Sequence, residues 1–104
     1  MVDAPGKKVL SVSQLNRMAR QLLETDLPVL WVEGEVSNLA RPASGHLYFS
    51  LKDDKAQIRC ALFRGRGRNT DVAVANGHQV VARGRVSLYE PRGDYQLIVE
   101  HLEP

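Results

Sequence analysis

The chain has 104 residues, of which 43% are hydrophobic and 25% charged, a size and balance that favour one folded domain over intrinsic disorder. No apolar run approaches the roughly 18 residues of a membrane span, and no secretion signal follows Lys7 and Lys8. The formal net charge of +2 excludes neither an enzyme nor a binding module, and a single cysteine excludes an internal disulfide and favours a cytosolic setting.

An N-terminal helix is the first predicted element. Residues 1–10 read as a flexible leader, and residues 11–27 are predicted to form an α-helix that Ser13 caps and Pro28 terminates. Hydrophobic residues recur at helical spacing along one face: Leu15, Met18, Ala19, Leu22 and Leu23. We expect this stripe to pack against the rest of the domain and to stabilise the helix, with Met18 as a core residue.

From residue 28 onward the helical period gives way to the alternation that is typical of β-strands. Alternating residues occupy five stretches, namely 29–38, 46–53, 57–63, 79–90 and 94–103. Gly34 and Gly84 fall in the middle of two of these stretches, where a glycine marks a bend. Cys60 falls on the apolar side of its strand and is predicted to be an inert core residue.

The connection after the third strand completes the fold prediction. Residues 71–77 could supply one or two helical turns that end at Gly77. A mainly β protein with five strands, a preceding helix and a short helical turn between strands 3 and 4 fits an OB-fold, a five-stranded Greek-key barrel, over residues 28–104. The alternative is a small β-sandwich, which would need about seven strands.

Residues suited to catalysis or metal binding are scarce. His46, His78 and His101 lie far apart and have no partner at a motif spacing. Glu33 and Glu35 share one strand face and could share a metal ion, but no third ligand accompanies them. The string "GRGR" lacks the Lys-Ser/Thr ending of a phosphate-binding loop. The sequence therefore predicts no catalytic residue, no metal site and no cofactor.

Cations are concentrated in the middle of the chain. Residues 38–93 hold ten Lys and Arg and four Asp and Glu (10 − 4 = +6), whereas the rest of the chain sums to 4 − 8 = −4. A basic segment within a nearly neutral chain favours a surface that binds a polyanion. The alternative is a solvated surface on which the arginines serve solubility.

Single-stranded nucleic acid needs cations along its backbone and exposed aromatic rings for its bases. In an OB-fold, strands 2 and 3 and the 1–2 and 4–5 loops provide that surface. We predict that its nucleic-acid-binding residues are Tyr48, Lys52, Arg59 and Phe63 on strands 2 and 3, Arg41 in the 1–2 loop, Arg83 and Arg85 on strand 4, Tyr89 and Arg92 at the 4–5 loop, and Arg64, Arg66 and Arg68 in the glycine-spaced loop after strand 3. The three loop arginines have the least structural reason to be present, so the functional expectation is strongest for them.

Several of these side chains have a structural alternative. Tyr48 and Phe63 could be covered by the helix or could close one end of the barrel. Arg83 and Arg85 could pair across strands with the two carboxylates of the first strand. Trp31 shares a strand face with those carboxylates, so we expect it to pack under the helix and not against a base.

A family resemblance covers the chain from about Ser11 to Pro104. It rests on four strings in this order: "SVSQLNRMARQLLE", "LWVEGEVSNL", "SGHLYFSLKDDKAQIRCALFR" and "GHQVVARGRVSLYEPRGDYQLIVE". Together they closely resemble the N-terminal OB-fold domain of the exodeoxyribonuclease VII large subunit, and "GHLYFSLKD" with "YEPRGDYQL" is the most specific part. The string "RGRGRNT" falls in a stretch that varies in the family.

The resemblance implies a role within a larger nuclease. In that family a much longer catalytic region follows, and the large subunit acts with many copies of a small helical subunit. The assembly degrades single-stranded DNA to oligonucleotides in the bacterial cytoplasm. This domain is then expected to bind DNA without cutting it and to be inactive when isolated. The small subunit is expected to bind to the rest of the protein and not to this domain.

Two other functions stay open at this point. The same surface could dock the missing catalytic region or another subunit, which would make the domain structural. The string "LKDDKAQIRCALF" also resembles a hairpin of anticodon-binding OB-folds, which would favour RNA as the ligand.

Overall fold

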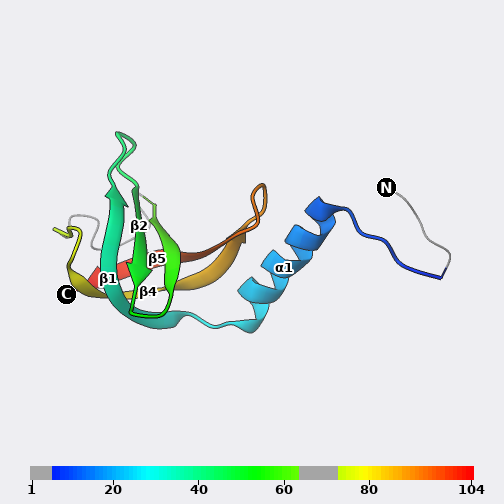
Figure 1. Ribbon diagram of the computed structural model, residues 1–104, viewed down its shortest axis with the longest axis horizontal. Coiled ribbons are helices and arrows are strands. Elements are labelled where there is room, and N and C mark those ends of the chain that lie inside the picture. Colours follow the sequence, from blue (N-terminus) through cyan, green and yellow to red (C-terminus); the bar gives the residue numbers. More distant parts are fainter. Residues whose placement is uncertain (1–5, 64–72) are drawn as a thin grey trace.

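A computed structural model describes residues 6–63 and 73–104 of the chain (Figure 1). This described part contains one α-helix and five β-strands. Their bounds are α1 Val12–Asp26, β1 Leu30–Ala40, β2 Leu47–Lys52, β3 Gln57–Leu62, β4 Gln79–Tyr89 and β5 Asp94–Glu103. The five predicted strands are confirmed, with small differences at their ends.

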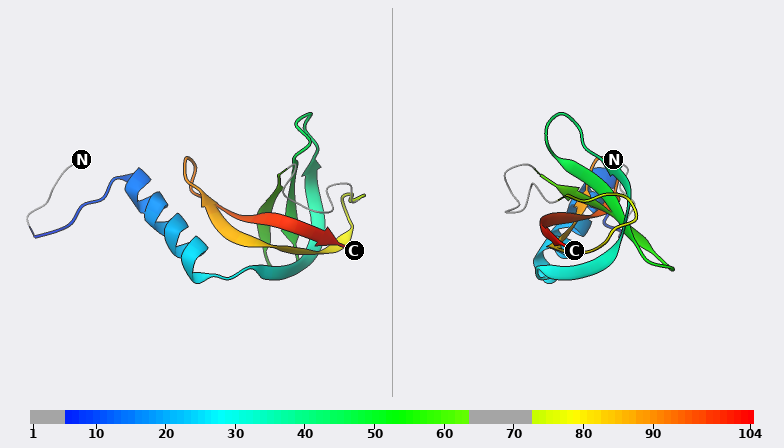
Figure 2. Two further views of the ribbon diagram at one scale, coloured as in Figure 1. Left: turned by 180° about the vertical axis from the view of Figure 1, so that it is seen from behind. Right: turned by 90° about the vertical axis from the view of Figure 1, so that its left-hand side faces the viewer.

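The strands form a closed barrel in the order β1-β2-β3-β5-β4. Neighbouring strands are antiparallel except β3 and β5, which are parallel. The barrel closes because β1 pairs with β4 along its first half and with β2 along its second half. This is the predicted five-stranded barrel, and α1 lies outside it at one end of the molecule (Figures 1 and 2).

The core fills the barrel with inward-facing residues from all five strands. Phe49 and Leu97 are fully buried, and Cys60 is 2% exposed. Burial raises the pKa of the Cys60 thiol to about 12, which confirms that this cysteine is an inert core residue. The other buried hydrophobic residues of the core are Val36, Leu47, Leu51, Leu62, Val74, Val80, Ala82, Val86, Val99 and Leu102.

Two glycines allow the bends that close the barrel, as predicted. A Cβ atom on Gly34 would lie 3.2 Å from the carbonyl oxygen of Lys52, where β1 changes partner from β4 to β2. A Cβ atom on Gly84 would collide with the carbonyl oxygen of Ile98, beside a break in the β4–β5 register. Any side chain at Gly84 would therefore push two hydrogen-bonded backbones apart.

The connection between β3 and β4 differs from the prediction. Residues 71–72 lie outside the described part, and the described residues 73–78 form a turn and no helix. The Gly77 amide donates to the Val36 carbonyl at 2.8 Å, and the Val36 amide donates to the His78 carbonyl at 2.9 Å. These bonds engage the turn with β1 in place of the bonds that a helical turn would make.

The start of α1 also differs from the prediction, because Ser11 and not Ser13 is the N-cap. The Ser11 hydroxyl accepts a hydrogen bond from the Gln14 amide at 3.1 Å, and the Ser11 amide donates to the Gln14 side chain at 2.8 Å. This capping box satisfies two backbone amides at once, those of Ser11 and Gln14, and the helix therefore begins after Ser11. The helix ends two residues before Pro28, as predicted.

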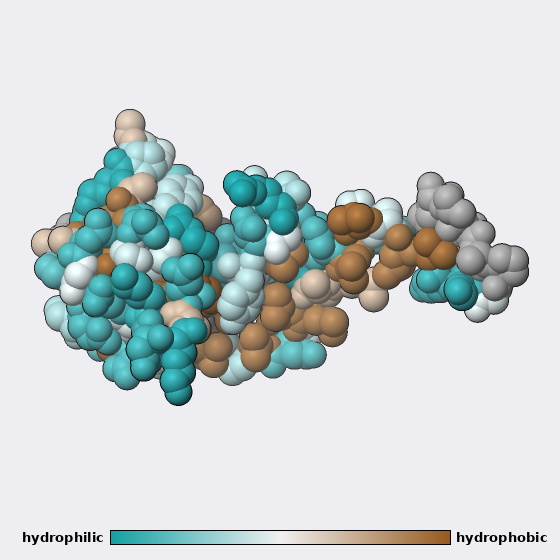
Figure 3. Space-filling view, viewed as in Figure 1, coloured by the Kyte–Doolittle hydropathy of each residue, from teal (hydrophilic) through white to brown (hydrophobic). Residues whose placement is uncertain are grey.

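The packing of α1 contradicts the expected burial of its apolar stripe. Leu15, Met18 and Leu22 are 54%, 47% and 60% exposed, so Met18 is a surface residue and not part of the core. Figure 3 shows hydrophobic residues gathered on the surface of α1. Leu23 and Leu27, near the end of the helix, do pack against the barrel core. Polar side chains of α1 also bond to β4 and the β4–β5 loop, and these contacts shape the groove described next.

Candidate nucleic-acid interface

The outer face of the barrel carries a continuous row of side chains across four strands. Tyr48 on β2 pairs with Ala61 on β3, and Ala61 pairs with Ile98 on β5. Ile98 in turn pairs with Arg85 on β4. Residues paired in register point to the same face of a sheet, so an aromatic ring and a guanidinium flank an apolar centre.

A second row runs across the same four strands two residues away. Ser50 pairs with Arg59, and Arg59 pairs with Gln96. Gln96 pairs with Ser87 on β4. The Arg59 guanidinium donates to the Ser50 hydroxyl at 2.9 Å, which holds the arginine across β2. Ser50 and Ser87 are buried and already bonded, so Arg59 and Gln96 are the hydrogen-bonding groups that this row presents beside the first row.

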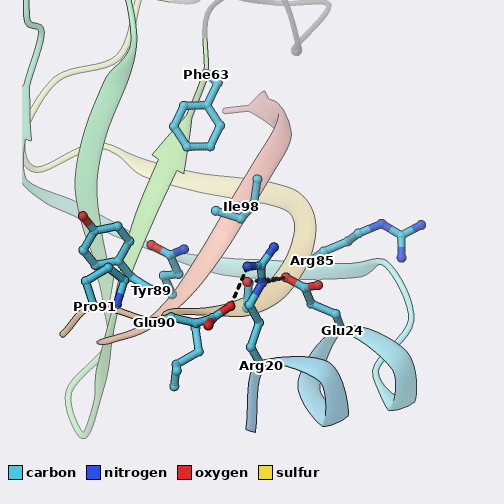
Figure 4. Close-up of a pocket in the computed structure, with 11 residues that line it drawn as sticks. Arg20, Glu24, Phe63, Arg85, Tyr89, Glu90, Pro91 and Ile98 are labelled. Carbon is cyan, nitrogen blue, oxygen red and sulfur yellow. Dashed lines mark hydrogen bonds and ion pairs between the residues drawn. The ribbon is translucent and has the colours of Figure 1, made fainter. Parts of the chain in front are cut away.

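A groove of about 820 Å³ lies beside these rows, between the barrel and α1 (Figure 4). Phe63 lines it from the end of β3, and Arg85 and Tyr89 line it from β4. Arg20 and Glu24 line it from α1, on the opposite side from Phe63 (Figure 4). The helix therefore forms one wall of the groove and leaves it open.

Hydrogen bonds hold that wall in place along β4 and the β4–β5 loop. The Asn16 side chain donates to the carbonyl of Glu90 at 2.9 Å. The Ser87 hydroxyl donates to a carboxylate oxygen of Glu24 at 2.6 Å. Together with the packing of Leu23 and Leu27 on the core, these bonds fix which side of α1 faces the barrel.

One arginine forms ion pairs with both carboxylates of the groove. Arg20 Nε lies 3.0 Å from Glu24 Oε2, and Arg20 Nη1 lies 2.7 Å from Glu90 Oε2. The hydrogen bond to Glu90 is the main cause that raises the pKa of Arg20 above its usual value. The hydrogen bond from Ser87, followed by that from Arg20, lowers the pKa of Glu24, so this carboxylate is ionised at neutral pH.

Arg85 differs from Arg20 in having no counter-charge. Its side chain is exposed and forms no ion pair with any residue in the ranges 6–63 and 73–104. The charged residues that line the described groove are Arg20, Arg85, Glu24 and Glu90, which sum to zero, and Arg85 is the one of the two arginines whose guanidinium is not held in an ion pair with a described residue.

Aromatic rings stand at two places along the groove. The Phe63 ring lies 5.3 Å from the ring of His46 and 6.4 Å from the ring of Tyr48, each edge to face. Phe63 and Tyr48 are half-buried by this cluster, and α1, which packs against β4, does not cover them. Tyr89 is 49% exposed. Phe63 and Tyr89 therefore present ring surface to a ligand.

Arg83 lies outside the groove, and the alternative that it pairs with the carboxylates of β1 is wrong. Its Nε lies 2.8 Å from a carboxylate oxygen of Glu100 on the neighbouring strand β5. The guanidinium also lies 6.0 Å from the centre of the Trp31 ring, which is 55% exposed. Trp31 contacts His101 edge to face at 5.8 Å, so it does not pack under the helix as expected. The pairing of Trp31 with Arg83 in register, on the side of β1 next to β4, explains this position.

Three further predicted cations are engaged by neighbours and do not line the groove. Arg41 donates to the carbonyl of Val74 at 2.7 Å, which ties the β1–β2 loop to the segment before β4. Lys52 Nζ lies 3.7 Å from a carboxylate oxygen of Glu35, and Arg92 Nε lies 3.6 Å from a carboxylate oxygen of Asp94. Exposed ion pairs are weak, so Lys52 and Arg92 remain available to a ligand that reaches them.

The strongest sequence candidates, Arg64, Arg66 and Arg68, lie outside the described residues. In the part of the chain that the structure describes, no group of three His, Cys, Asp or Glu residues could hold a metal ion. The described helix is also too short and too polar to cross a membrane.

The sequence prediction missed the groove residues Arg20, Glu90, Gln96 and Ile98. The alternation of the fifth strand places Gln96 and Ile98 on one or the other face but does not show that they lie beside β3, because the parallel pairing of β3 with β5 is not visible in local sequence. A signal for Arg20 did exist, since Asn16, Arg20 and Glu24 recur every four residues and form a polar stripe along one side of the helix.

The sequence as a whole has known relatives. A family model described as "OB-fold nucleic acid binding domain" matches residues 10–103. The chain belongs to this family. The OB-fold domain is 58% identical over 104 residues to the exodeoxyribonuclease 7 large subunit of Pseudoalteromonas translucida, which covers 100% of the chain and 23% of the relative. It is 60% identical over 98 residues to the large subunit of Pseudomonas aeruginosa strain LESB58, which covers 94% and 21%.

These matches confirm the resemblance that the four strings indicated. The OB-fold domain spans less than a quarter of the length of these relatives and corresponds to their N-terminal part.

Solved structures share the fold at low sequence identity. A replication protein A heterotrimer bound to single-stranded DNA matches with a TM-score of 0.61 and 20% identity, over 75% of this chain and 57% of that chain. A putative aspartyl-tRNA synthetase from Leishmania major matches with a TM-score of 0.62 and 13% identity, over 97% and 21%. These likenesses establish the barrel and nothing further.

Proposed function

We propose that this OB-fold domain binds single-stranded DNA along the groove between the barrel and α1. The observation that carries the proposal is that one groove brings together the half-buried ring of Phe63, the exposed ring of Tyr89 and the guanidinium of Arg85, which forms no ion pair with a described residue. Membership of a nucleic-acid-binding family supports this class of ligand. The name of the relatives, exodeoxyribonuclease, and the solved neighbour bound to single-stranded DNA favour DNA.

Each part of a single strand has a counterpart in the groove. Unpaired bases stack on the rings of Phe63 and Tyr89, and each stacked base contributes about 1–3 kcal/mol. The side-chain amide of Gln96 donates and accepts hydrogen bonds at a base edge. Arg85 contacts a phosphate, and the arginines that follow Phe63 in the sequence add charge to the same strand.

The rest of the protein would then cut the strand that this domain holds. We assign the full-length protein as an exodeoxyribonuclease large subunit that degrades single-stranded DNA to oligonucleotides in the bacterial cytoplasm. The region beyond the OB-fold domain, which makes up more than three quarters of each relative, would carry the catalytic residues and bind the small subunit. The isolated domain is accordingly expected to bind DNA without cleaving it.

Anisotropy titrations with a fluorescent thymidine oligomer at several salt concentrations test the proposal. Arg85→Gln should reduce the slope of log affinity against log salt by about 0.7, because one phosphate contact is lost. Tyr89→Ala should weaken binding by about 1–3 kcal/mol because one stacking platform is lost. Lys55→Gln is the matched control, since it removes one positive charge from the exposed β2–β3 turn, away from the groove.

Two results would contradict this function. One is a salt slope for Arg85→Gln that equals that of Lys55→Gln. The other is tighter binding of a uridine RNA oligomer than of the thymidine oligomer, which would support the RNA-binding alternative.

A further inference from the structure

The exposed apolar side of α1 has no partner among the described residues. Val12 is 76% exposed, and Leu15, Met18 and Leu22 are 54%, 47% and 60% exposed. We call these four residues the α1 stripe. A surface helix of a globular protein normally turns its apolar side toward the core. Here Asn16 and Arg20 donate hydrogen bonds to Glu90, and Glu24 accepts one from Ser87, which holds this side of the helix against the barrel and leaves the stripe facing outward.

The spacing of the stripe is that of a helix–helix seam. Leu15, Met18 and Leu22 are separated by three and four residues, which is the spacing of the apolar positions in two packed helices. A shallow depression of about 270 Å³ lies between Met18, Leu22 and Thr25, and it offers a hole for a side chain of a second helix. Gln21 and Asp26 also line the depression, so the facing surface should be apolar along the stripe and polar at the C-terminal edge of the helix.

We propose that the α1 stripe docks against an apolar helix face in the remainder of the full-length large subunit. This inference rests on the proposed function, because it assumes that the domain is part of such a subunit. The relatives support that occupant by their length, since the domain corresponds to 23% of the Pseudoalteromonas translucida protein and the other 77% (100 − 23) lies beyond the match.

The size of the stripe favours this tethered partner over a second copy of the domain. The stripe consists of four side chains on one helix of 15 residues, whereas an interface between separate molecules takes about 20–30 residues on each side. A stable complex between separate molecules buries about 800 Å² on each partner. A partner on the same polypeptide is present at an effective concentration of the order of 1 mM, at which a patch of this size can be occupied.

Docking at the stripe would also fix one side of the DNA groove. Arg20 and Glu24 line the groove from the same helix whose opposite side carries the stripe. Within the described residues α1 packs against β4 and no other element, so its position depends on few contacts. A partner on the stripe would therefore hold the groove wall from outside.

Amide hydrogen exchange tests the proposal in two proteins, the 104-residue chain and the full-length large subunit that contains it. The amides of α1 should exchange about tenfold more slowly in the full-length protein than in the short chain. The double variant Leu15→Gln/Leu22→Gln should remove this difference and leave the exchange of the barrel unchanged, because glutamine preserves both charge and helix propensity. Tyr95→Gln is the matched control, since Tyr95 on β5 is 52% exposed and lies outside the stripe.

The outcomes separate this inference from the proposed function. Equal exchange of α1 in both proteins would overturn docking, as would a stable dimer of the short chain that the double variant dissociates. DNA affinity of the short chain should be the same with and without the double variant. Absence of DNA binding by the unmodified chain would overturn the proposed function. Docking would then still be decided by the exchange rates of α1 in the two proteins.

Discussion

Replacing Gly84 by alanine perturbs a close backbone approach between β4 and β5. A Cβ atom at this position would collide with the carbonyl oxygen of Ile98 and would lie 3.0 Å from the Cα of Val99. The obstructing atoms belong to backbone that is paired with β4, so they cannot move aside as a flexible side chain would. Overpacking of this kind costs about 1–3 kcal/mol.

The unfolded state offsets part of that cost. Alanine has less freedom than glycine in the unfolded chain, which returns about 0.4–1 kcal/mol of stability. We therefore expect Gly84→Ala to lower the free energy of unfolding by about 1–2 kcal/mol. At about 4–8 °C per kcal/mol for a domain of this size, the midpoint of thermal unfolding should fall by roughly 5–15 °C.

Urea and thermal unfolding followed by circular dichroism measure this change. Gly34→Ala is the matched control, because its Cβ would lie 3.2 Å from the Lys52 carbonyl oxygen and needs a smaller adjustment. Gly84→Ala should be the less stable of the two variants. If it unfolds at the same midpoint as the parent, the close β4–β5 approach, and with it the position of Ile98 in the groove, is wrong.

The remaining predictions concern the helix cap, the buried thiol and a groove carboxylate. Ser11→Ala should speed amide exchange throughout α1 by removing about 0.5–2 kcal/mol of capping energy, whereas Ser13→Ala should leave exchange unchanged; the reverse order would refute the assigned cap. The stability of the parent relative to Cys60→Ala should fall as the pH rises from 9 to 12, because the unfolded thiol ionises near its usual pKa of 9.0 while the folded thiol keeps its proton until about 12; a constant difference over this range in urea titrations would contradict the burial of the thiol. Glu24→Gln should tighten binding of a thymidine oligomer and steepen its salt dependence, because it removes a negative charge and frees Arg20 from one partner; an affinity equal to that of the parent would place the DNA away from α1.

The barrel could be predicted because each strand repeats its hydrophobic residues with a period of two. Phe49 and Leu51 on β2 are buried and alternate with polar neighbours, and such alternation indicates a strand with one buried face. The turn before β4 could not be predicted in the same way. Gly77 bonds to Val36, which is 41 residues away (77 − 36), and local sequence carries no record of that partner.

The helix shows a different limit of sequence reasoning. Its period identified the element and its end at Pro28, but a period describes two sides and does not say which one meets the barrel. Arg20 and Glu24 face the barrel because they form hydrogen bonds with Glu90 and Ser87 there. Those partners lie more than 60 residues away in the sequence.

The candidate site was predicted in outline and not in detail. The alternation of each strand, combined with the surface that OB-folds use, selected Phe63 and Arg85, which line the groove, and Tyr48, which lies beside it. Register decides which cation is compensated, and register depends on contacts across the whole barrel. Arg83 and Arg85 are two residues apart on the same strand, yet Arg83 is paired with Glu100 and Arg85 has no such partner among the described residues.

The central claim is that single-stranded DNA lies in the groove between the barrel and α1. A titration of the isotope-labelled chain with a short thymidine oligomer, followed by backbone amide chemical shifts, measures this most directly. The account predicts that the largest saturable shifts occur at Arg85, Tyr89 and Gln96, with small shifts at Arg83 and Lys55. Shifts centred on Trp31 and Arg83, or none that saturate, would contradict it.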